Sequence, residues 1–293
     1  MDRRPTLRRP VLIAAFRGWN DGAQGASLAA SYLAKSWSAE RFADIDPEDF
    51  FDFQAVRPQV SLIDGVTRHI EWPENAFYDA SMPTAQDEAG RDAVLLLGVE
   101  PNTHWRTFTG EIIELAQHVE VELVVTLGAL LADVPHTRPS PVTGAATDAK
   151  LVEELGLSTS RYEGPTGIVG VLHDACREAS LASASLWAAV PHYASMAPSP
   201  RAAHALCSRL ADLVDATLDL EELERAGDLY EKQVSEAVAA DDETAAYVHE
   251  LERRADELAA QEDLPSGDTL AAELTRFLQE HEARRREEEQ SED

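Results

Sequence analysis

Residues 11–33 constrain the fold of this chain more than any other stretch. Their sequence, VLIAAFRGWNDGAQGASLAASYL, begins with six consecutive apolar residues (11–16), the pattern of a strand buried on both faces of a parallel sheet. Small and apolar residues follow at helical spacing over 23–33, and Asn20 or Asp21 can cap the first turn of that helix. A strand that leads through a tight turn into a helix predicts an α/β fold.

Two further apolar runs repeat the pattern of the first. Residues 93–99 and 121–127 are predicted to be buried strands, and a helix that we expect to begin near Thr109 separates them. Two successive strand–helix–strand units predict a right-handed parallel crossover with helices on both faces of the sheet. Alternating apolar and polar residues over 41–71 predict antiparallel strands appended to this sheet.

A long connection follows the third apolar strand. The stretch 130–147 contains Pro135, Pro139 and Pro141, so we expect it to lack regular structure. Loops of this length in compact domains are usually functional or disordered. Its apolar start and the cluster at 136–138, His-Thr-Arg, favour an ordered functional loop.

The charge of the chain restricts its partners. Asp and Glu number 54 against 25 Lys and Arg, which gives a formal net charge of −29. Proteins that bind nucleic acid need a basic stripe to displace counterions, so we expect neither nucleic acid nor an anionic membrane as a partner. The first apolar run ends at Phe16, too early for a membrane span or a signal-peptide core, and we therefore expect a cytoplasmic protein.

Acidic residues are concentrated at the carboxyl end. From Asp219 to Asp293 there are 25 acidic and 8 basic residues, a net charge of −17. This shift predicts an α/β domain over 10–218, an acidic helical region over 219–286, and an acidic tail over 287–293 that we expect to be disordered. The helical region should form three helices, whose narrow apolar stripes can pack on the α/β domain or on a second subunit: 220–238, 243–260 and 269–285.

Several kinds of chemistry lack their sequence signatures here. The glycines at 18, 22 and 25 do not match a dinucleotide fingerprint, and no phosphate-binding lysine follows them. Ser27 lies within the expected helix without the sharp turn that a nucleophilic serine needs, so it is predicted to be a packing residue. The histidines lack paired metal-ligand spacing, and Cys176 and Cys207 are expected to be buried thiols. We expect no metal and no cofactor.

Chemically capable side chains gather in the turns that follow the predicted strands. Asp21 and Glu100 could act as acid or base, Arg138 could hold an anion beside a helix N-terminus, and an indole could stack on a ring. The same residues could equally be turn, cap and packing residues, and the sequence leaves both interpretations open. The candidate ligand-binding residues are Trp19, Asn20, Asp21, Glu100, Asn102, Trp105, His136, Arg138, Tyr162 and Glu163.

Four segments carry a family resemblance when they are taken together and in order. They are FRGWNDG at 16–22, GVEPN at 98–102, LADVPHTRP at 131–139 and YEGPTG at 162–167. In these motifs the chain resembles the PAC2 family, the proteasome assembly chaperone 2 type, in its actinobacterial branch, over residues 10 to about 218. The resemblance implies a phosphorylase/hydrolase-like fold with three αβα layers, a mixed and mostly parallel sheet, and a homo-oligomer such as a trimer.

The resemblance also bears on function. Eukaryotic and archaeal relatives that escort proteasome subunits dock through a C-terminal signal of a hydrophobic residue, Tyr and any residue, whereas this sequence ends in QSED. We therefore expect a non-enzymatic, protein-binding or assembly-chaperone-like oligomer whose acidic helices offer a different binding surface. The alternative is a protein that binds an anionic or nucleoside-like small molecule, or a phosphorylase/hydrolase-type enzyme, using the crevice at the carboxyl ends of the strands.

Overall fold

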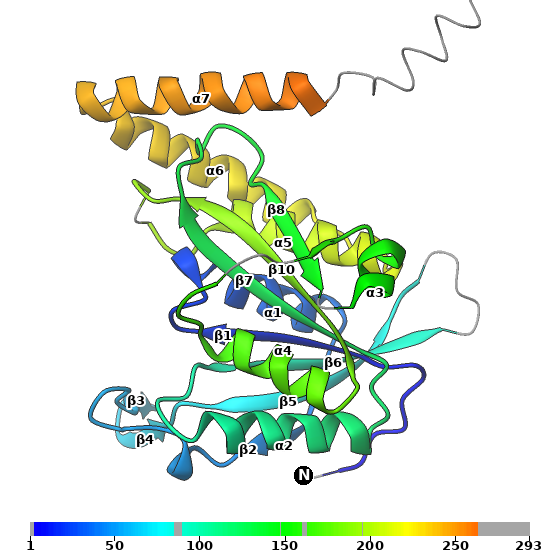
Figure 1. The fold of residues 1–293 in the computed structure, drawn as a ribbon. Coiled ribbons are helices and arrows are strands. Elements are labelled where there is room, and N and C mark those ends of the chain that lie inside the picture. Colours follow the sequence, from blue (N-terminus) through cyan, green and yellow to red (C-terminus); the bar gives the residue numbers. More distant parts are fainter. Residues whose placement is uncertain (1–2, 85–89, 147, 160–162, 195, 263–293) are drawn as a thin grey trace, which may run out of the picture.

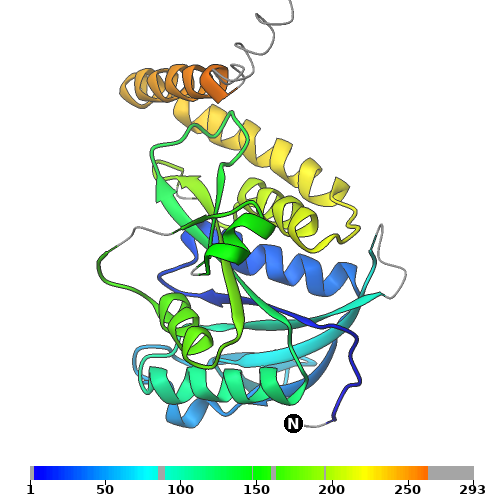
Figure 2. The ribbon, with the colours of Figure 1, turned by 45° about the vertical axis from the view of Figure 1, so that its right-hand side comes forward.

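The computed structural model describes residues 3–84, 90–146, 148–159, 163–194 and 196–262. Within them an eight-stranded sheet runs in the order β2-β5-β6-β1-β7-β10-β8-β9, with helices on both faces (Figures 1 and 2). The predicted α/β fold with three layers and a mixed sheet is confirmed. The strands of this sheet are β1 (Val11–Arg17), β2 (Glu40–Ile45), β5 (Asn75–Met82), β6 (Arg91–Val99), β7 (Leu123–Ala132), β8 (Val142–Ala146), β9 (Ser158–Thr159) and β10 (Ala182–Pro191).

Strand β1 lies inside the sheet and is buried on both faces. It pairs in parallel with β6 on one side and with β7 on the other. Val11, Ile13 and Ala15 belong to the core on one face, while Leu12, Ala14 and Phe16 belong to the core on the other. A strand in this position has no solvent-facing side, so its sequence must be apolar at every position rather than at every second one.

Two pairs of helices cover the sheet. Helices α1 (Gly25–Ser36) and α5 (Pro200–Val214) pack on the face of Val11 and Ile13, and a short helix, α3 (Ala149–Glu154), contacts β8. Helices α2 (Trp105–His118) and α4 (Ile168–Glu178) pack on the opposite face. The connection after β1 therefore leaves toward one face of the sheet and the connection after β6 toward the other.

Two predicted boundaries are wrong. Helix α2 begins at Trp105 and not near Thr109, whose hydroxyl instead donates to the carbonyl of Trp105, one turn earlier, at 3.0 Å. The stretch 130–147 is not irregular throughout, because β7 continues to Ala132 beside β10, and 142–146 form β8 against the other edge of β10. The three prolines lie between these two strands, and the lack of regular structure is confined to that segment.

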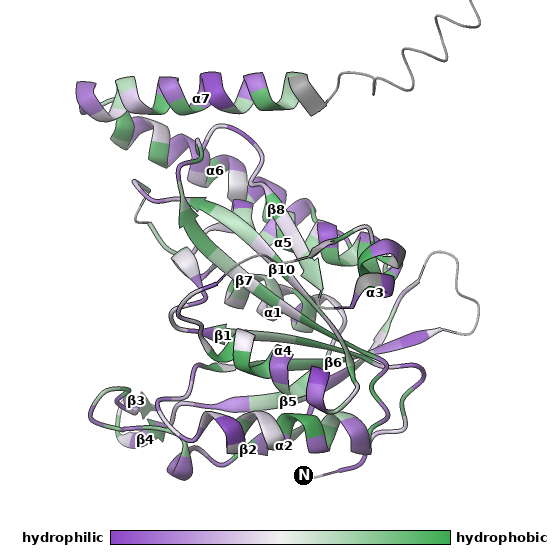
Figure 3. Ribbon diagram, in the orientation of Figure 1, coloured by the Kyte–Doolittle hydropathy of each residue, from purple (hydrophilic) through white to green (hydrophobic). Residues whose placement is uncertain are grey.

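The acidic region begins with two helices that differ in their packing. Helix α6 (Glu221–Val238) packs on α5 and buries Leu223, Tyr230 and Val234. Helix α7 (Asp242–Glu262) lies across one end of the molecule, and its surface is more hydrophilic than that of β1 and β7 (Figure 3). The predicted boundary at 218 falls between α5 and α6, although the division into domains stays a prediction. The helix expected at 269–285 and the tail at 287–293 lie outside the described residues.

A separate hairpin extends from the sheet. Strands β3 (Gln59–Ile63) and β4 (Thr67–Glu71) form a two-stranded antiparallel sheet of their own, at the lower left of Figure 1. Cys176 and Cys207 are free and buried, as expected, and burial raises the pKa of each thiol to about 12. None of the helices in the described ranges has the length and apolar character to cross a bilayer.

Candidate functional site

The carboxylate of Glu100 joins three segments at the carboxyl edge of the sheet. Its Oε2 accepts a hydrogen bond from the backbone N–H of Trp19 at 3.1 Å. Its Oε1 accepts from the backbone N–H of Ile168 at 2.9 Å and from the side-chain amide of Asn20 at 3.4 Å. Because Ile168 begins α4, the negative charge also lies at the positive end of that helix. Glu100 therefore ties the turn after β1 to the start of α4.

Two glycines leave the space that this carboxylate occupies. A Cβ on Gly18 would lie 2.9 Å from both Cβ and Oε2 of Glu100, and the φ of Gly18, +146°, is one that side chains rarely adopt. A Cβ on Gly167 would lie 2.7 Å from Oε1 of Glu100 and 2.3 Å from the Asn20 amide nitrogen. Gly18 and Gly167, one glycine from each of two motifs, are thus explained by the packing around Glu100.

Asp21 caps the first turn of α1, as the sequence predicts. Its Oδ1 accepts from the backbone N–H groups of Ala26 and Ser27 at 2.9 and 3.1 Å, and its Oδ2 accepts from the Ser27 hydroxyl at 2.6 Å. Burial raises the pKa of Asp21, while these hydrogen bonds act in the opposite direction. The Ser27 hydroxyl is occupied by this contact.

The next turn along the sheet edge is held by local contacts. Asn102 accepts from the backbone N–H of Asp52 at 2.9 Å, and its own N–H donates to the carbonyl of Phe50 at 2.9 Å. The Trp105 indole donates to the carbonyl of Pro101 at 2.6 Å. Both predicted site residues therefore fasten the loop that precedes α2.

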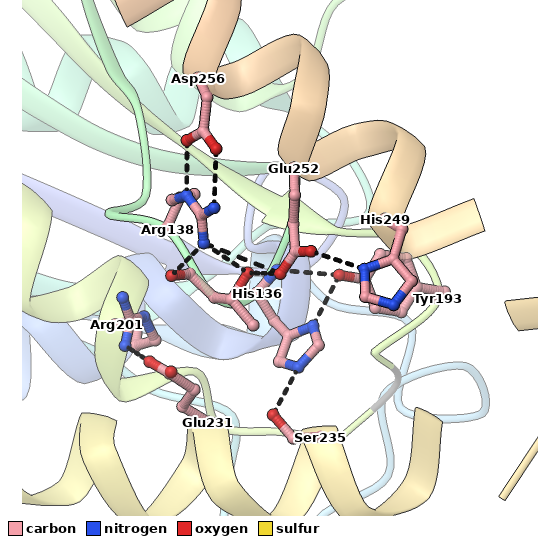
Figure 4. Close-up of polar contacts among 10 residues, drawn as sticks. His136, Arg138, Tyr193, Arg201, Glu231, Ser235, His249, Glu252 and Asp256 are labelled. Carbon is pink, nitrogen blue, oxygen red and sulfur yellow. Dashed lines mark hydrogen bonds and ion pairs between the residues drawn. The ribbon is translucent and has the colours of Figure 1, made fainter. Parts of the chain in front are cut away.

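A second group of predicted site residues holds the acidic helices. Arg138 donates to both carboxylate oxygens of Asp256 on α7, from Nε at 2.7 Å and from Nη2 at 2.8 Å (Figure 4). The neighbouring Thr137 hydroxyl donates to Glu252 at 2.5 Å. These contacts lower the pKa of Asp256, chiefly through Arg138, and that of Glu252, chiefly through Thr137. Arg138 thus has a protein carboxylate where a ligand anion was expected.

His136 lies between the body and α6. The Tyr193 hydroxyl accepts from the backbone N–H of His136 at 2.8 Å and also lies 2.8 Å from Nδ1 of the ring. Nε2 lies 2.9 Å from the hydroxyl of Ser235 on α6, so both ring nitrogens have a hydroxyl partner (Figure 4). The side chain is 3% exposed, and burial lowers its pKa, which favours the neutral ring.

The ten predicted residues therefore fall into separate groups. Turns around Glu100 hold Asn20 and Glu100, and the docked helices α6 and α7 hold His136 and Arg138. No hydrogen bond or ion pair joins these two pairs in the part of the chain that the structure describes. The Trp19 side chain and Glu163 are exposed, and Tyr162 lies outside the described residues. Their role as ligand-binding residues stays a prediction, because the contacts seen are with other protein groups.

The sequence gives no signal for several partners of this site. Ser235, Glu252 and Asp256 come from helices whose acidic, polar sequence shows no motif, and Tyr193 follows the last strand in a loop. Only the acidic composition of 219–262 hints that an arginine elsewhere would find a carboxylate there. Over the described ranges, no group of three His, Cys, Asp or Glu residues is arranged to hold a metal ion.

Comparison with known proteins gives a consistent result. The profile of the PAC2 family matches residues 15–238. A PAC2 family protein from Streptomyces avermitilis is 46% identical, with 82% of this chain and 99% of that chain covered and a TM-score of 0.75. A proteasome-assembly chaperone homologue from Mycobacterium tuberculosis is 44% identical, with 81% and 99% covered and a TM-score of 0.73.

More distant similarity concerns the fold alone. An archaeal proteasome activator from Pyrococcus furiosus is 19% identical, with 80% of this chain and 96% of that chain covered and a TM-score of 0.64. No curated protein matches the chain.

Replacing Glu100 by alanine should destabilise the protein by about 2 kcal/mol, because two backbone N–H groups lose a charged acceptor. Urea unfolding of wild type, Glu100→Ala and Glu100→Gln measures the effect, and the glutamine, which keeps one acceptor oxygen, should give an intermediate value. Hydrogen exchange at the Ile168 amide should quicken in the alanine variant. An unchanged free energy of unfolding would show that the hydrogen bonds of Glu100 to Trp19 and Ile168 do not stabilise the protein.

Arg138→Gln should release α7 from the body while the sheet stays folded, because it removes the bidentate contact with Asp256. Amide hydrogen exchange over α7 should quicken by at least about threefold, the size expected from one exposed ion pair. The control is Arg253→Gln, since the ion pairs of Arg253 within the described residues are with Glu250 and Glu257 on α7 itself. Equal exchange in the two variants would show that α7 is held by other contacts.

Acidification should weaken the packing around His136. A group whose folded pKa is lowered contributes its stability in full above its unfolded pKa, about 6.5 for His, and loses it as the pH falls below that value toward the folded pKa. The free energy of unfolding should therefore fall more steeply between about pH 7 and pH 5 in wild type than in His136→Gln. His173, whose pKa burial lowers to about 4, is present in both proteins and cancels in the comparison. An equal pH dependence of the free energy of unfolding in the two proteins would refute the lowered pKa of His136.

Proposed function

Because the chain belongs to the PAC2 family, we propose that it acts by binding proteins: copies of the chain associate through the α/β body, and the assembly binds further proteins as an assembly chaperone does. The relative from Mycobacterium tuberculosis, which is 44% identical, is described as a proteasome-assembly chaperone homologue. That similarity supports a protein-binding role for this chain, and we further propose that it acts in the cytoplasm and without a cofactor.

The observation that carries this proposal is the apolar face of the β3–β4 hairpin. Val60 lies opposite Ile70 and two residues from Leu62, so the three side chains share one face of the hairpin. They are 64%, 52% and 61% exposed. A two-stranded hairpin is marginally stable by itself in water, and its apolar face normally requires a covering surface. At the base of the hairpin the Trp72 ring packs edge-on against that of Phe53, with 4.8 Å between the ring centroids.

We assign a second copy of this chain as the partner of that face. Arg68 lies opposite Leu62 on the apolar face and forms no ion pair with any described residue. Another copy of the chain offers an identical apolar face to these side chains. Interfaces between permanently associated copies are more apolar than transient ones, which fits this combination.

The acidic helices supply the surface for other proteins. The body holds α7 through Thr137 and Arg138, while Glu243, Glu257 and other acidic residues of α7 remain exposed. An exposed face of one sign attracts a partner of the other sign and speeds its association. The enzymatic alternative is less well supported, because protein groups occupy Asp21, Glu100 and Arg138.

The double variant Val60→Asp/Ile70→Asp should convert an oligomer into monomers, because it places two charges in the proposed interface. Size-exclusion chromatography with light scattering, over a range of protein concentrations, measures the mass. The control is Ser61→Asp, which adds a charge to the opposite face of the same strand and should leave the mass unchanged. A monomeric wild type, or an unchanged mass in the double variant, would refute the interface.

Affinity capture tests the second part of the proposal. The wild-type oligomer, used as bait at low and moderate salt, should enrich a protein partner over a control protein of equal negative charge. No enrichment over that control at either salt concentration would contradict the binding of further proteins.

A further inference from the structure

A cavity of about 370 Å³ opens at the carboxyl ends of β1 and β6, on the α1 face of the sheet. The connection after β1 leaves toward this face, and the connection after β6 leaves toward the opposite one (Figure 2). Two adjacent parallel strands with this arrangement form the crevice in which open α/β sheets bind ligands. The volume is also within the range of small-molecule pockets. None of the described residues predicted as the ligand site lines this cavity.

Arg17, the last residue of β1, brings a positive charge to the cavity. Its guanidinium has no hydrogen bond and no ion pair with any residue in the described ranges. Acidic residues outnumber Lys and Arg by 54 to 25, so the missing partner does not reflect a shortage of carboxylates. The other charged residue of the lining, Glu74, is already paired with Arg41 at 2.5 Å. The cavity therefore presents the exposed guanidinium of Arg17, which acts on the Asp21 carboxylate through its charge but forms no ion pair within the described residues.

Neutral hydrogen-bonding groups lie around this cation. Gln24 and Ser31 come from the segment that leads through α1, and Tyr78 comes from β5. Their side chains make no hydrogen bond within the described part of the chain. Burial raises the pKa of Tyr78, so its hydroxyl is a proton donor at neutral pH. Ser27 also lines the cavity, but Asp21 already accepts its proton.

We propose that this cavity binds a small molecule with a phosphate or carboxylate group on a hydroxylated body. Arg17 holds the anionic group, since a guanidinium matches two oxygens of a phosphate or a carboxylate. Gln24, Ser31 and Tyr78 bind the hydroxyl groups, and apolar residues of β1, β6 and α1 form the walls. This site is separate from the hairpin and from α7, so its test is independent of the protein-binding role.

Isothermal titration of the full chain with four probes tests the site: glycerol 3-phosphate, glycerate, inorganic phosphate and glycerol. Glycerol 3-phosphate or glycerate should bind more tightly than inorganic phosphate, and glycerol should not bind. The stronger of the two distinguishes a phosphate from a carboxylate ligand. Absence of binding by both up to about 10 mM, where even weak specific complexes are detected, would overturn the proposal.

Two variants and a control locate the binding. Arg17→Gln should weaken the affinity at least about tenfold, as expected from the loss of a charged hydrogen-bonding pair. Ser31→Trp should abolish binding by filling the cavity, since Ser31 is exposed on α1 and its replacement leaves the core intact. Arg106→Gln, which changes an exposed arginine on the opposite face of the sheet, should bind as wild type does. Equal affinity in Arg17→Gln and wild type would place the anion elsewhere and refute the site.

Discussion

The burial of β1 on both faces is the constraint on which the rest of the structure depends. In β1 the six residues 11–16 are buried and apolar, and the first polar side chain, Arg17, comes where the strand ends. From that point the backbone N–H groups of the turn need acceptors. Glu100, which follows the neighbouring strand β6, supplies one for the N–H of Trp19, and Asp21 supplies others for the first turn of α1.

The same constraint explains why the motif residues cluster in the turns. A carboxylate that accepts from two segments at once needs close backbone approach, which the glycines at 18 and 167 permit. Its position is then fixed by the strand before it and the helix after it. The packing around Glu100 accounts for these two glycines of the family motifs.

Local patterns in the sequence predict the buried parallel strands β1, β6 and β7, because burial on both faces of a sheet favours apolar residues at every position. They failed where the deciding partner is distant. The start of α2 was misplaced because Thr109, a residue type that often caps helices, bonds back to Trp105 within the helix. The strand β8 was missed because its partner, β10, comes about forty residues later. Likewise, the residues around Arg138 do not indicate that its partner is Asp256, which lies 118 positions later in the chain.

These failures show which residues are informative about function. His136 and Arg138 have the chemistry of a ligand site, yet protein groups satisfy them, and their work is to hold α6 and α7. Arg17 is an ordinary last residue of a strand in the sequence, yet in the structure it lines a cavity and forms no ion pair with a described residue. A side chain that remains unpartnered after folding retains its capacity to bind something else, and only the folded chain identifies it. The same argument applies to apolar surface: Val60 and Ile70 remain exposed on the hairpin after folding, so their face can bind a partner.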